Sequence, residues 1–508
     1  YYEQVHIVYT PHNVYGNFPA NVEMLYLLSM IVEDDVYAGA AVAKCVNMIL
    51  GLLCVFAAYV AGREMSHGVG VFTAIVCASI GWLPYLCGVA YVENGMLLFA
   101  MIAAGAILRA ARCPAGGHAQ MTWVSVAGLM SGFACGCKYS AVLLVAIPTA
   151  FAVATMSWST WGNRLRATSL CCAATLVTFA PWLIKNVAMT GNPVFPLAGT
   201  VFKAYPAGWG ETESLHFAQS HQPDDDVSSL VSRLRVFWQR IPADPLQRFG
   251  PLVFVLAAFR LLSPSRNRTD LALLGMLVAQ SLAWAFATHL YARFAVPLVI
   301  PLVLLAGRAY ASCRTSRLRA GCVALAVLGI GFNIFQSARL YVDHVYADGH
   351  KLPVEGVDQY FLEGLIDGHQ HLSVVNMELP PDSRILLIGD AKAFYFRRRV
   401  DYRVVFNRSP FIEAVRAATT DCDIMDWLRE KRYTHVLVNW AEVHRLRSSR
   451  YGFPEVVQPE LFARLANCGL VQTNTFATSR SDTPYAALYR IAMEESVTPS
   501  AIDAKPKE

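Results

Sequence analysis

The chain has 508 residues, of which 55% are hydrophobic and only 16% are charged, and its mean hydropathy is +0.38. Soluble domains carry about 25% charged residues, so the composition excludes a string of soluble domains, and it excludes collagen-like and disordered chains as well. The net charge of +5 is mild, and no run of Lys and Arg interleaved with aromatic residues indicates nucleic-acid binding. A membrane protein is therefore predicted over most of the length.

The opening segment, residues 1–35, is predicted to end an extracytoplasmic loop. It turns at Pro19 and continues as an apolar helix that lies on or enters the membrane. The chain starts at Tyr1 with neither a signal peptide nor a preceding span. A translocated polar segment normally needs a hydrophobic element upstream, so we expect that the first span is missing from this sequence.

Residues 36–338 are predicted to form a polytopic transmembrane domain with about ten spans. A long outside loop, about 185–249, divides it. Some runs are shorter than the roughly 20 residues that a straight span needs, so the predicted boundaries of these spans are approximate. The ten apolar runs are 36–62, 69–90, 91–108, 124–137, 141–156, 167–183, 250–262, 271–287, 294–307 and 320–335.

Basic residues predict the orientation of these spans, because Lys and Arg near span ends stay in the cytoplasm. If residues 1–35 lie outside, the inside loops carry twelve arginines and the short outside loops only Lys138 and Arg293. Ten spans return the chain to the outside. The segment after residue 338 is therefore predicted to be extracytoplasmic.

Residues 339–495 are predicted to fold as a soluble α/β domain with a partly parallel sheet, followed by a polar tail at 496–508. We read Gly389 as an ordinary strand-to-helix turn and the domain as a cover or acceptor-recognition module. Helical spacing marks 412–418, 424–431 and 459–467. Strands are predicted at Arg384–Ile388, 402–406, 434–439 and 486–491.

Eleven of the thirteen cysteines lie between Cys45 and Cys322, in or beside apolar runs, where a free thiol behaves as a small hydrophobic group. Cys422 and Cys468 fall in the soluble domain. They could form one disulfide if that domain faces an oxidising compartment. No spacing of Cys and His indicates a metal site, and no cofactor is predicted.

Charged residues gather at the predicted outer ends of the spans, where burying charge is costly and so points to function. Carboxylates there can deprotonate an acceptor, and cations can hold a phosphate. Snorkelling and helix capping remain the structural alternatives. The catalytic candidates are Glu23 and Glu93, the candidate ligands of a donor phosphate are Lys138, Lys185 and Arg293, and the residues expected near substrate are His289, Tyr139 and Tyr291.

Several of these residues lie in segments that resemble, in order, bacterial GT-C glycosyltransferases, which are related to protein O-mannosyltransferases and to the lipid A aminoarabinose transferase. The soluble domain is similar to one that some of these enzymes carry. The matching segments are NVYGNFPANVEMLYL (13–27), AYVENG (90–95), GFACGCKYSAVLL (132–144), PWLIKNVAMTGNPVFP (181–196), THLYARFAVPLVIPL (288–302), RILLIGDAKAFYF (384–396) and THVLVNWAEVHRL (434–446).

The resemblance implies transfer of a sugar from a polyprenyl-phosphate donor to a lipid, glycan or protein acceptor, at the outer face of a bacterial cytoplasmic membrane. In such enzymes an Asp or Glu early in the first outside loop is catalytic, and that position would precede Tyr1. Glu93 matches the carboxylate of the second outside loop. The resemblance also allows a divalent metal, for which the residues offer no ligand set.

Two other functions stay open. A transporter of an anionic or lipid-linked substrate would also have many spans, but it predicts repeated halves, and no convincing repeat is present. A polymerase or ligase would take a lipid-diphosphate glycan. It would favour a long outside loop rich in Arg and His, and the loop supplies His216, His221, Arg233, Arg235 and Arg240.

Overall fold

The computed structural model describes residues 6–223, 227–244, 246, 248–346, 368–478 and 481–492. The predicted tail at 496–508 lies outside these residues. The chain divides into two compact units. Unit 1 contains Tyr15–Ala204 and His221–His350, and unit 2 contains Thr10–Val14, Tyr205–Ser220 and the C-terminal part. The first two segments of unit 2 lie outside the boundaries that we predicted for the soluble domain.

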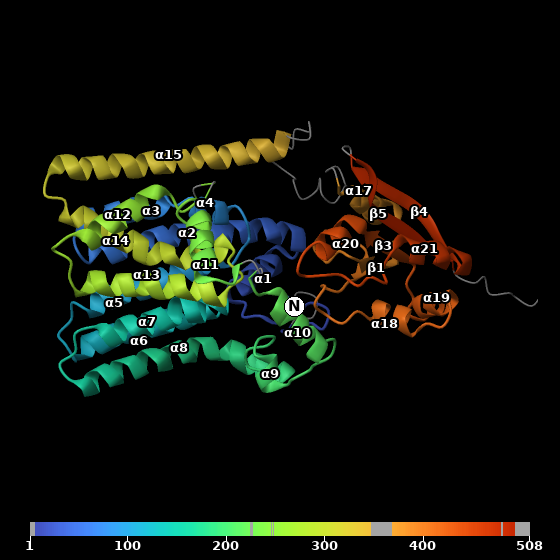
Figure 1. The fold of residues 1–508 in the computed structure, drawn as a ribbon, viewed down its shortest axis with the longest axis horizontal. Helices are drawn as coiled ribbons and strands as arrows, with labels where there is room; N and C mark the ends of the chain where they lie inside the picture. The colour runs from blue at the N-terminus through green and yellow to red at the C-terminus, as the bar shows by residue number, and fades with distance from the viewer. Residues whose placement is uncertain are drawn as a thin grey trace, which may run out of the picture. The chain divides into compact units, whose positions relative to one another are not determined.

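Unit 1 is a bundle of helices (Figure 1). Every apolar run predicted above coincides with a helix or a pair of helices. Its elements are α1 (Asn21–Glu33), α2 (Val36–Arg63), α3 (His67–Ala78), α4 (Trp82–Cys87), α5 (Glu93–Ala110), α6 (His118–Cys135), η2 (Val142–Ala146), α7 (Ile147–Thr155), α8 (Trp161–Thr190), α9 (Gly199–Phe202), α11 (Leu230–Arg240), α12 (Pro251–Leu262), α13 (Arg268–Ala287), η4 (Ala292–Leu298), α14 (Val299–Ser312) and α15 (Ser316–Tyr346), and η1 (Val14–Asn17) precedes α1.

Six helical segments in the described part of the chain are long and apolar enough to cross a membrane. They are α2, α5, α8, α13, η4 with α14, and the first 21 residues of α15. Three further apolar segments, α3, η2 with α7, and α12, are shorter. The helices α5 and α14 are the most enclosed, whereas α15 and α8 run along opposite edges of the bundle (Figure 1).

Small residues bring the helices around α5 close together, as they do in membrane bundles. Gly51 of α2 lies against Cys87 and Asn94, and a Cβ there would come within 2.5 Å of the Cys87 sulfur. Gly105 of α5 faces Ala61 in the same way. This close packing fixes the first turn of α5, which carries Glu93.

Unit 2 contains a five-stranded sheet in the order β2-β1-β3-β5-β4. β1 is parallel to β2 and β3, and β5 is antiparallel to β3 and β4, so a partly parallel sheet is confirmed. The elements of unit 2 are α10 (Glu211–Ser220), α17 (Gln370–Ser373), η5 (Val374–Glu378), β1 (Arg384–Ile388), η6 (Ala393–Tyr395), β2 (Arg399–Asp401), α18 (Pro410–Ala417), α19 (Asp421–Glu430), β3 (His435–Asn439), α20 (Trp440–Arg447), α21 (Pro459–Leu465), η7 (Ala466–Cys468), β4 (Leu470–Thr478) and β5 (Ser481–Ile491).

The strand predicted at 402–406 is wrong, because β2 ends at Asp401. β1 pairs Leu386 with Asp401 and ends two residues later, at Ile388, before Gly389 with its φ of 84°, so no part of β1 lies opposite residues 404–406. Their backbone bonds elsewhere: the Val404 amide donates to the His12 carbonyl over 3.1 Å. The disulfide between Cys422 and Cys468 is present.

Candidate functional site

Three of the predicted residues meet at the first turn of α5. The Glu93 side chain is only 2% exposed, and its Oε1 atom lies 2.8 Å from Lys138 Nζ and 3.2 Å from Arg293 Nε. Lys138 comes from the turn between α6 and η2, and Arg293 from η4. A buried carboxylate needs such partners, and here it holds two cations beside each other.

Aromatic rings complete the surroundings of the two cations. Lys138 Nζ lies 3.8 Å from the centre of the Phe294 ring, and the Arg293 guanidinium carbon lies 4.3 Å from the centre of the Tyr91 ring. Rings at these distances attract cations and limit their hydration. Both charges therefore stay in fixed positions and can act strongly on an anion brought next to them.

The turn that precedes Glu93 is tied to α2 by a buried asparagine. Asn47 donates from Nδ2 to the carbonyls of Leu86 and Val89, each over 2.6 Å. Asn94 donates to the Asn47 carbonyl over 3.3 Å. In the sequence, Asn47 is a lone polar residue inside an apolar run. The prediction did not single it out.

Glu23 is carried to the same place by α1. Gly95 lies against Val22, and Tyr26 donates its hydroxyl to the Tyr91 carbonyl over 2.8 Å. The pKa of Glu23 is raised to about 7, chiefly by burial and also by the nearby Glu93, whereas its own backbone hydrogen bond and Lys138 act in the opposite direction. Glu23 keeps an exposed face, so solvent moderates this rise.

The segment after α13 adds rings next to the cations. The His289 ring lies 4.6 Å from the ring centres of Tyr291 and Phe294, and 5.6 Å from that of His221. Burial lowers the pKa of His289 to about 4, and the neighbouring cationic side chains and His221 lower it as well. At neutral pH this ring is therefore uncharged.

Lys185 and Tyr139 have partners of their own. Lys185 Nζ donates to the Asn17 carbonyl over 2.8 Å. The Tyr139 hydroxyl donates to the Phe195 carbonyl over 3.1 Å and accepts from Asn186 Nδ2 over 2.7 Å. Among the residues that the structure describes, neither side chain is hydrogen-bonded or ion-paired to the Glu93 carboxylate, so these two predicted residues support the chain around the cluster.

A cleft of about 550 Å³ adjoins the cluster through Arg293. Its lining combines aromatic rings with cationic groups, which suits an anionic or sugar-bearing ligand. Part of the cationic charge is neutralised, because Arg248 forms a bidentate pair with Asp244. Arg240, which donates to the Leu290 carbonyl, contributes another guanidinium. The lining residues are Trp82, Tyr85, Tyr91, Gln239, Arg240, Asp244, Arg248, Tyr291, Ala292 and Arg293.

Sequence reasoning found the charged members of the cluster and missed the groups that hold them. The prediction did not single out Tyr91, Phe294 or Asn47. In the sequence, Tyr91 is close to Glu93, and Phe294 directly follows Arg293. His221 and Arg240 were considered only for a lipid-diphosphate donor. Among the described residues no group of three His, Cys, Asp or Glu could hold a metal ion, so no step is assigned to one.

Comparison with known proteins addresses the fold. A family described as a domain of unknown function (DUF8201) matches residues 96–300, less than half of the chain. No curated protein sequence matches. The apo crystal structure of ArnT from Cupriavidus metallidurans is similar, with a TM-score of 0.57 and 13% identity, covering 93% of this chain and 87% of ArnT.

Two further crystal structures agree. ArnT from Cupriavidus metallidurans bound to undecaprenyl phosphate matches with a TM-score of 0.51 and 13% identity, over 92% of this chain and 87% of ArnT. The Archaeoglobus fulgidus oligosaccharyltransferase tethered with an acceptor peptide matches with a TM-score of 0.52 and 14% identity, over 94% of this chain and 68% of the enzyme.

A helix bundle with apolar spans, joined in one chain to a sheet-containing unit, is thus the architecture of a GT-C fold. ArnT and the oligosaccharyltransferase are both members of that fold class. The chain shares the fold over nearly all of its length, which confirms the resemblance noted in the sequence.

Proposed function

We propose that the protein is a glycosyltransferase that moves a sugar from a polyprenyl-phosphate donor to a lipid, glycan or protein acceptor. The observation that carries this proposal is the pairing of Lys138 and Arg293 on one buried carboxylate beside a cleft. Two fixed cations stabilise the charge that develops on a departing phosphate. The similarity to ArnT, which has been crystallised with undecaprenyl phosphate, supports the same class of donor.

In the proposed reaction the acceptor oxygen attacks the anomeric carbon of the donor sugar. The bond from that carbon to the phosphate oxygen breaks, and polyprenyl phosphate leaves with the electron pair toward Lys138 and Arg293. The proton of the acceptor hydroxyl goes to Glu23, whose raised pKa suits proton transfer near neutral pH. Glu93 keeps both cations in place, and His289 and Tyr291 line the approach to them.

We further propose about ten spans, with unit 2 on the outer face of a bacterial cytoplasmic membrane. The bias of arginines toward one set of loops supports this orientation. The disulfide in unit 2 supports it independently, because disulfides persist in oxidising compartments.

The test is an assay of the full-length protein in proteoliposomes with polyprenyl-phosphate sugars and membrane extract, in which mass spectrometry follows released polyprenyl phosphate. We expect release by the wild type and at least a 100-fold loss in Glu93→Gln and Arg293→Ala. The matched control is Glu64→Gln, which removes a carboxylate paired with Arg109 beyond the other end of α5.

Release of free polyprenyl phosphate that persists unchanged in both site variants would overturn the assignment of these residues. No release from any donor by folded protein would overturn the function. A second candidate is transfer from a lipid diphosphate, because His221 and Arg240 lie close to His289 and Tyr291. The same assay separates the two, since that reaction releases polyprenyl diphosphate.

A further inference from the structure

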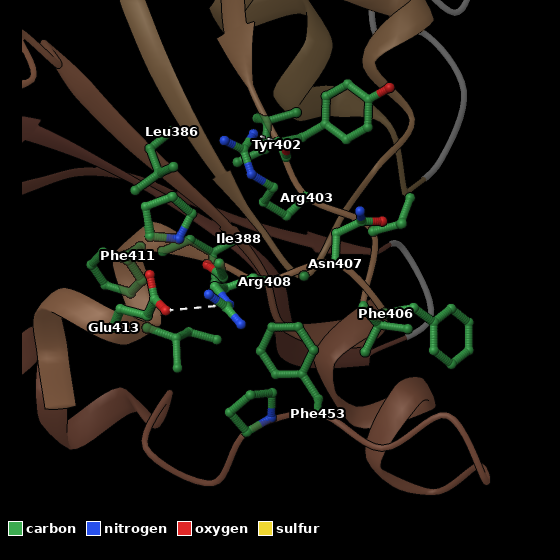
Figure 2. Close-up of a pocket in the computed structure, with 18 of the residues that line it drawn as sticks. Leu386, Ile388, Tyr402, Arg403, Phe406, Asn407, Arg408, Phe411, Glu413 and Phe453 are labelled. Carbon is green, nitrogen blue, oxygen red and sulfur yellow. Dashed lines mark hydrogen bonds and ion pairs between the residues drawn. The ribbon is translucent and has the colours of Figure 1, made fainter. Parts of the chain in front are cut away.

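A second pocket lies wholly within unit 2, and the proposed transfer chemistry does not use it. Its volume is about 240 Å³, which equals the space of about eight waters at about 30 Å³ each. It opens beside the carboxyl ends of β1 and β2, at Ile388, Gly389 and Asp401 (Figure 2). In open sheets with parallel strands, ligands bind at this edge of the sheet.

The pocket is assembled from three distant parts of the sequence. The Arg408 amide donates to the Gly208 carbonyl over 3.1 Å, and His216 Nε2 lies 2.7 Å from the Tyr451 carbonyl. The Phe406 ring packs against both His216 and Phe217, with ring centres 5.2 and 5.3 Å away. Because these contacts fix its walls, the pocket is preformed.

One wall is a row of aromatic rings. Phe411 and Trp427 have ring centres 6.2 Å apart, and Trp427 and Tyr433 have ring centres 6.0 Å apart. Trp427 is half-buried, so it keeps surface available to a ligand. Phe411 and Tyr433 are buried, at 2% and 7% exposure, so Trp427 is the ring that can pack against the apolar C–H face of a sugar ring.

The carboxylates that line the pocket are paired with arginines. Arg408 forms ion pairs with Glu213 at 3.5 Å and with Glu413 at 3.6 Å, and Figure 2 shows it facing Glu413. The carboxylate of Asp401 is occupied by Arg384, which it meets at 2.5 and 2.8 Å.

Two more arginines line the pocket with unused donors. With the residues that the structure describes, Arg403 makes one side-chain hydrogen bond, from Nη1 to the Tyr402 carbonyl over 2.8 Å. Arg416 has no side-chain hydrogen bond or ion pair with any residue that the structure describes. A guanidinium has five N–H donors in a planar fork that matches a carboxylate or phosphate.

We propose that this pocket binds an acidic saccharide, a sugar ring that bears a carboxylate or a phosphate. The ring packs on Trp427, and its anionic group lies toward Arg403 and Arg416. We assign the pocket to part of the acceptor, so this inference extends the proposed function and rests on it. Saccharide binding itself can be measured without turnover.

The test measures binding to the full-length protein in nanodiscs, without donor, by saturation-transfer difference NMR and calorimetry. The probes are methyl glucuronide, glucose 6-phosphate and neutral methyl glucoside. We expect one of the two anionic probes to bind at least tenfold more tightly than methyl glucoside, and the better anionic probe tells a carboxylate from a phosphate ligand.

The variants Arg416→Gln and Arg403→Gln should each weaken binding of that probe at least fivefold. Arg416 is exposed and has no partner among the described residues, so its replacement tests binding without disturbing the fold. The control is Arg445→Gln, an exposed arginine of α20 outside the pocket, which should bind as the wild type does.

Equal binding of the neutral and anionic probes, or binding that survives in both pocket variants, would overturn the proposal, and so would the absence of any binding. These outcomes are separate from the failure of the proposed function. A protein that releases polyprenyl phosphate but binds no saccharide in unit 2 refutes only the pocket, and a protein that binds the saccharide without transferring sugar refutes only the function.

Discussion

The Oε1 atom of Glu93 forms ion pairs with both Lys138 and Arg293, and this geometry separates the roles of Glu93 and Glu23, the two acidic residues of the candidate site. The carboxylate of Glu93 holds the side chains of Lys138 and Arg293 in place through these two ion pairs. Glu23 has no such ion pair within the described part of the chain, and burial raises its pKa. We therefore regard Glu93 as the residue that positions the cations and Glu23 as the proton acceptor.

Replacing Glu23 should remove a pH-dependent step. The base works only when deprotonated, and its pKa is raised toward 7, so wild-type activity should increase as the pH rises from 5 to 8. In Glu23→Gln we expect activity to fall by about 100-fold or more and this increase to disappear. The measurement is the initial rate of polyprenyl phosphate release at each pH.

Glu33→Gln is the matched control for that change, because Glu33 is an exposed carboxylate at the other end of the same helix. It should keep the wild-type rate and pH profile. A Glu23→Gln variant whose rate still increases with pH as the wild type's does would show that another group accepts the proton.

At the scale of elements, the position of α1 depends on a glycine. A Cβ at Gly95 would come within 2.4 Å of the Val22 side chain, well inside van der Waals contact. Val22 is fully buried and precedes Glu23. The lack of a side chain at position 95 therefore lets α1 bring Glu23 near Glu93.

Gly95→Ala should displace α1 and lower transfer at least tenfold, with a loss of about 1–3 kcal/mol in stability from overpacking. Transfer assays and thermal unfolding measure the two effects. Combining it with Val22→Ala removes the clashing methyl group and should restore part of the activity.

Gly321→Ala in α15 is the control, since nothing lies within 4 Å of the added methyl group. It should leave activity unchanged. If the Gly95→Ala and Val22→Ala double variant is no better than Gly95→Ala alone, then the steric explanation fails.

Helices and strands could be predicted where the pattern of apolar residues reflects local packing. Apolar runs located the helices of unit 1, and the short apolar run RILLI, which is followed by a turn, located β1. The strand expected at 402–406 failed because those residues bond to His12, a partner almost 400 residues away along the chain. β4 was missed, since its many polar residues show little of the pattern of a buried strand.

The candidate site was predictable in the same limited way. The cost of burying charge singled out Glu93, Lys138 and Arg293, and these three meet. The same reasoning singled out Lys185, whose ammonium instead bonds to a backbone carbonyl. Burial cost identifies a charge that needs a partner, but it does not say whether the partner is a ligand or the protein.

At the scale of the whole molecule, the one disulfide among the described residues belongs to unit 2, and the eleven remaining cysteines of unit 1 are free. A disulfide that closes a loop between residues separated by 46 positions lowers the conformational entropy of the unfolded chain, which stabilises the folded state by about 4 kcal/mol. Stability of the two units should therefore respond differently to reductant.

We expect dithiothreitol to lower the unfolding temperature of unit 2, and the double variant Cys422→Ser and Cys468→Ser to unfold at the lower temperature with or without it. Differential scanning fluorimetry gives both values. The control, Cys45→Ala with Cys172→Ala, replaces exposed free thiols of the bundle and should behave as the wild type does. A wild type that is insensitive to reductant would contradict this expectation.

During synthesis, the segments that make up unit 2 appear at widely separated times. Its segments Thr10–Val14 and Tyr205–Ser220 leave the ribosome long before β1 is made. Phe217, which is 4% exposed in the folded unit, packs on Trp209 of its own segment and on Phe406, so part of its cover arrives only with the C-terminal part. A chain interrupted before residue 368 would keep this aromatic surface open to chaperones and proteases, and premature termination should therefore lead to degradation of the whole product rather than to a stable bundle.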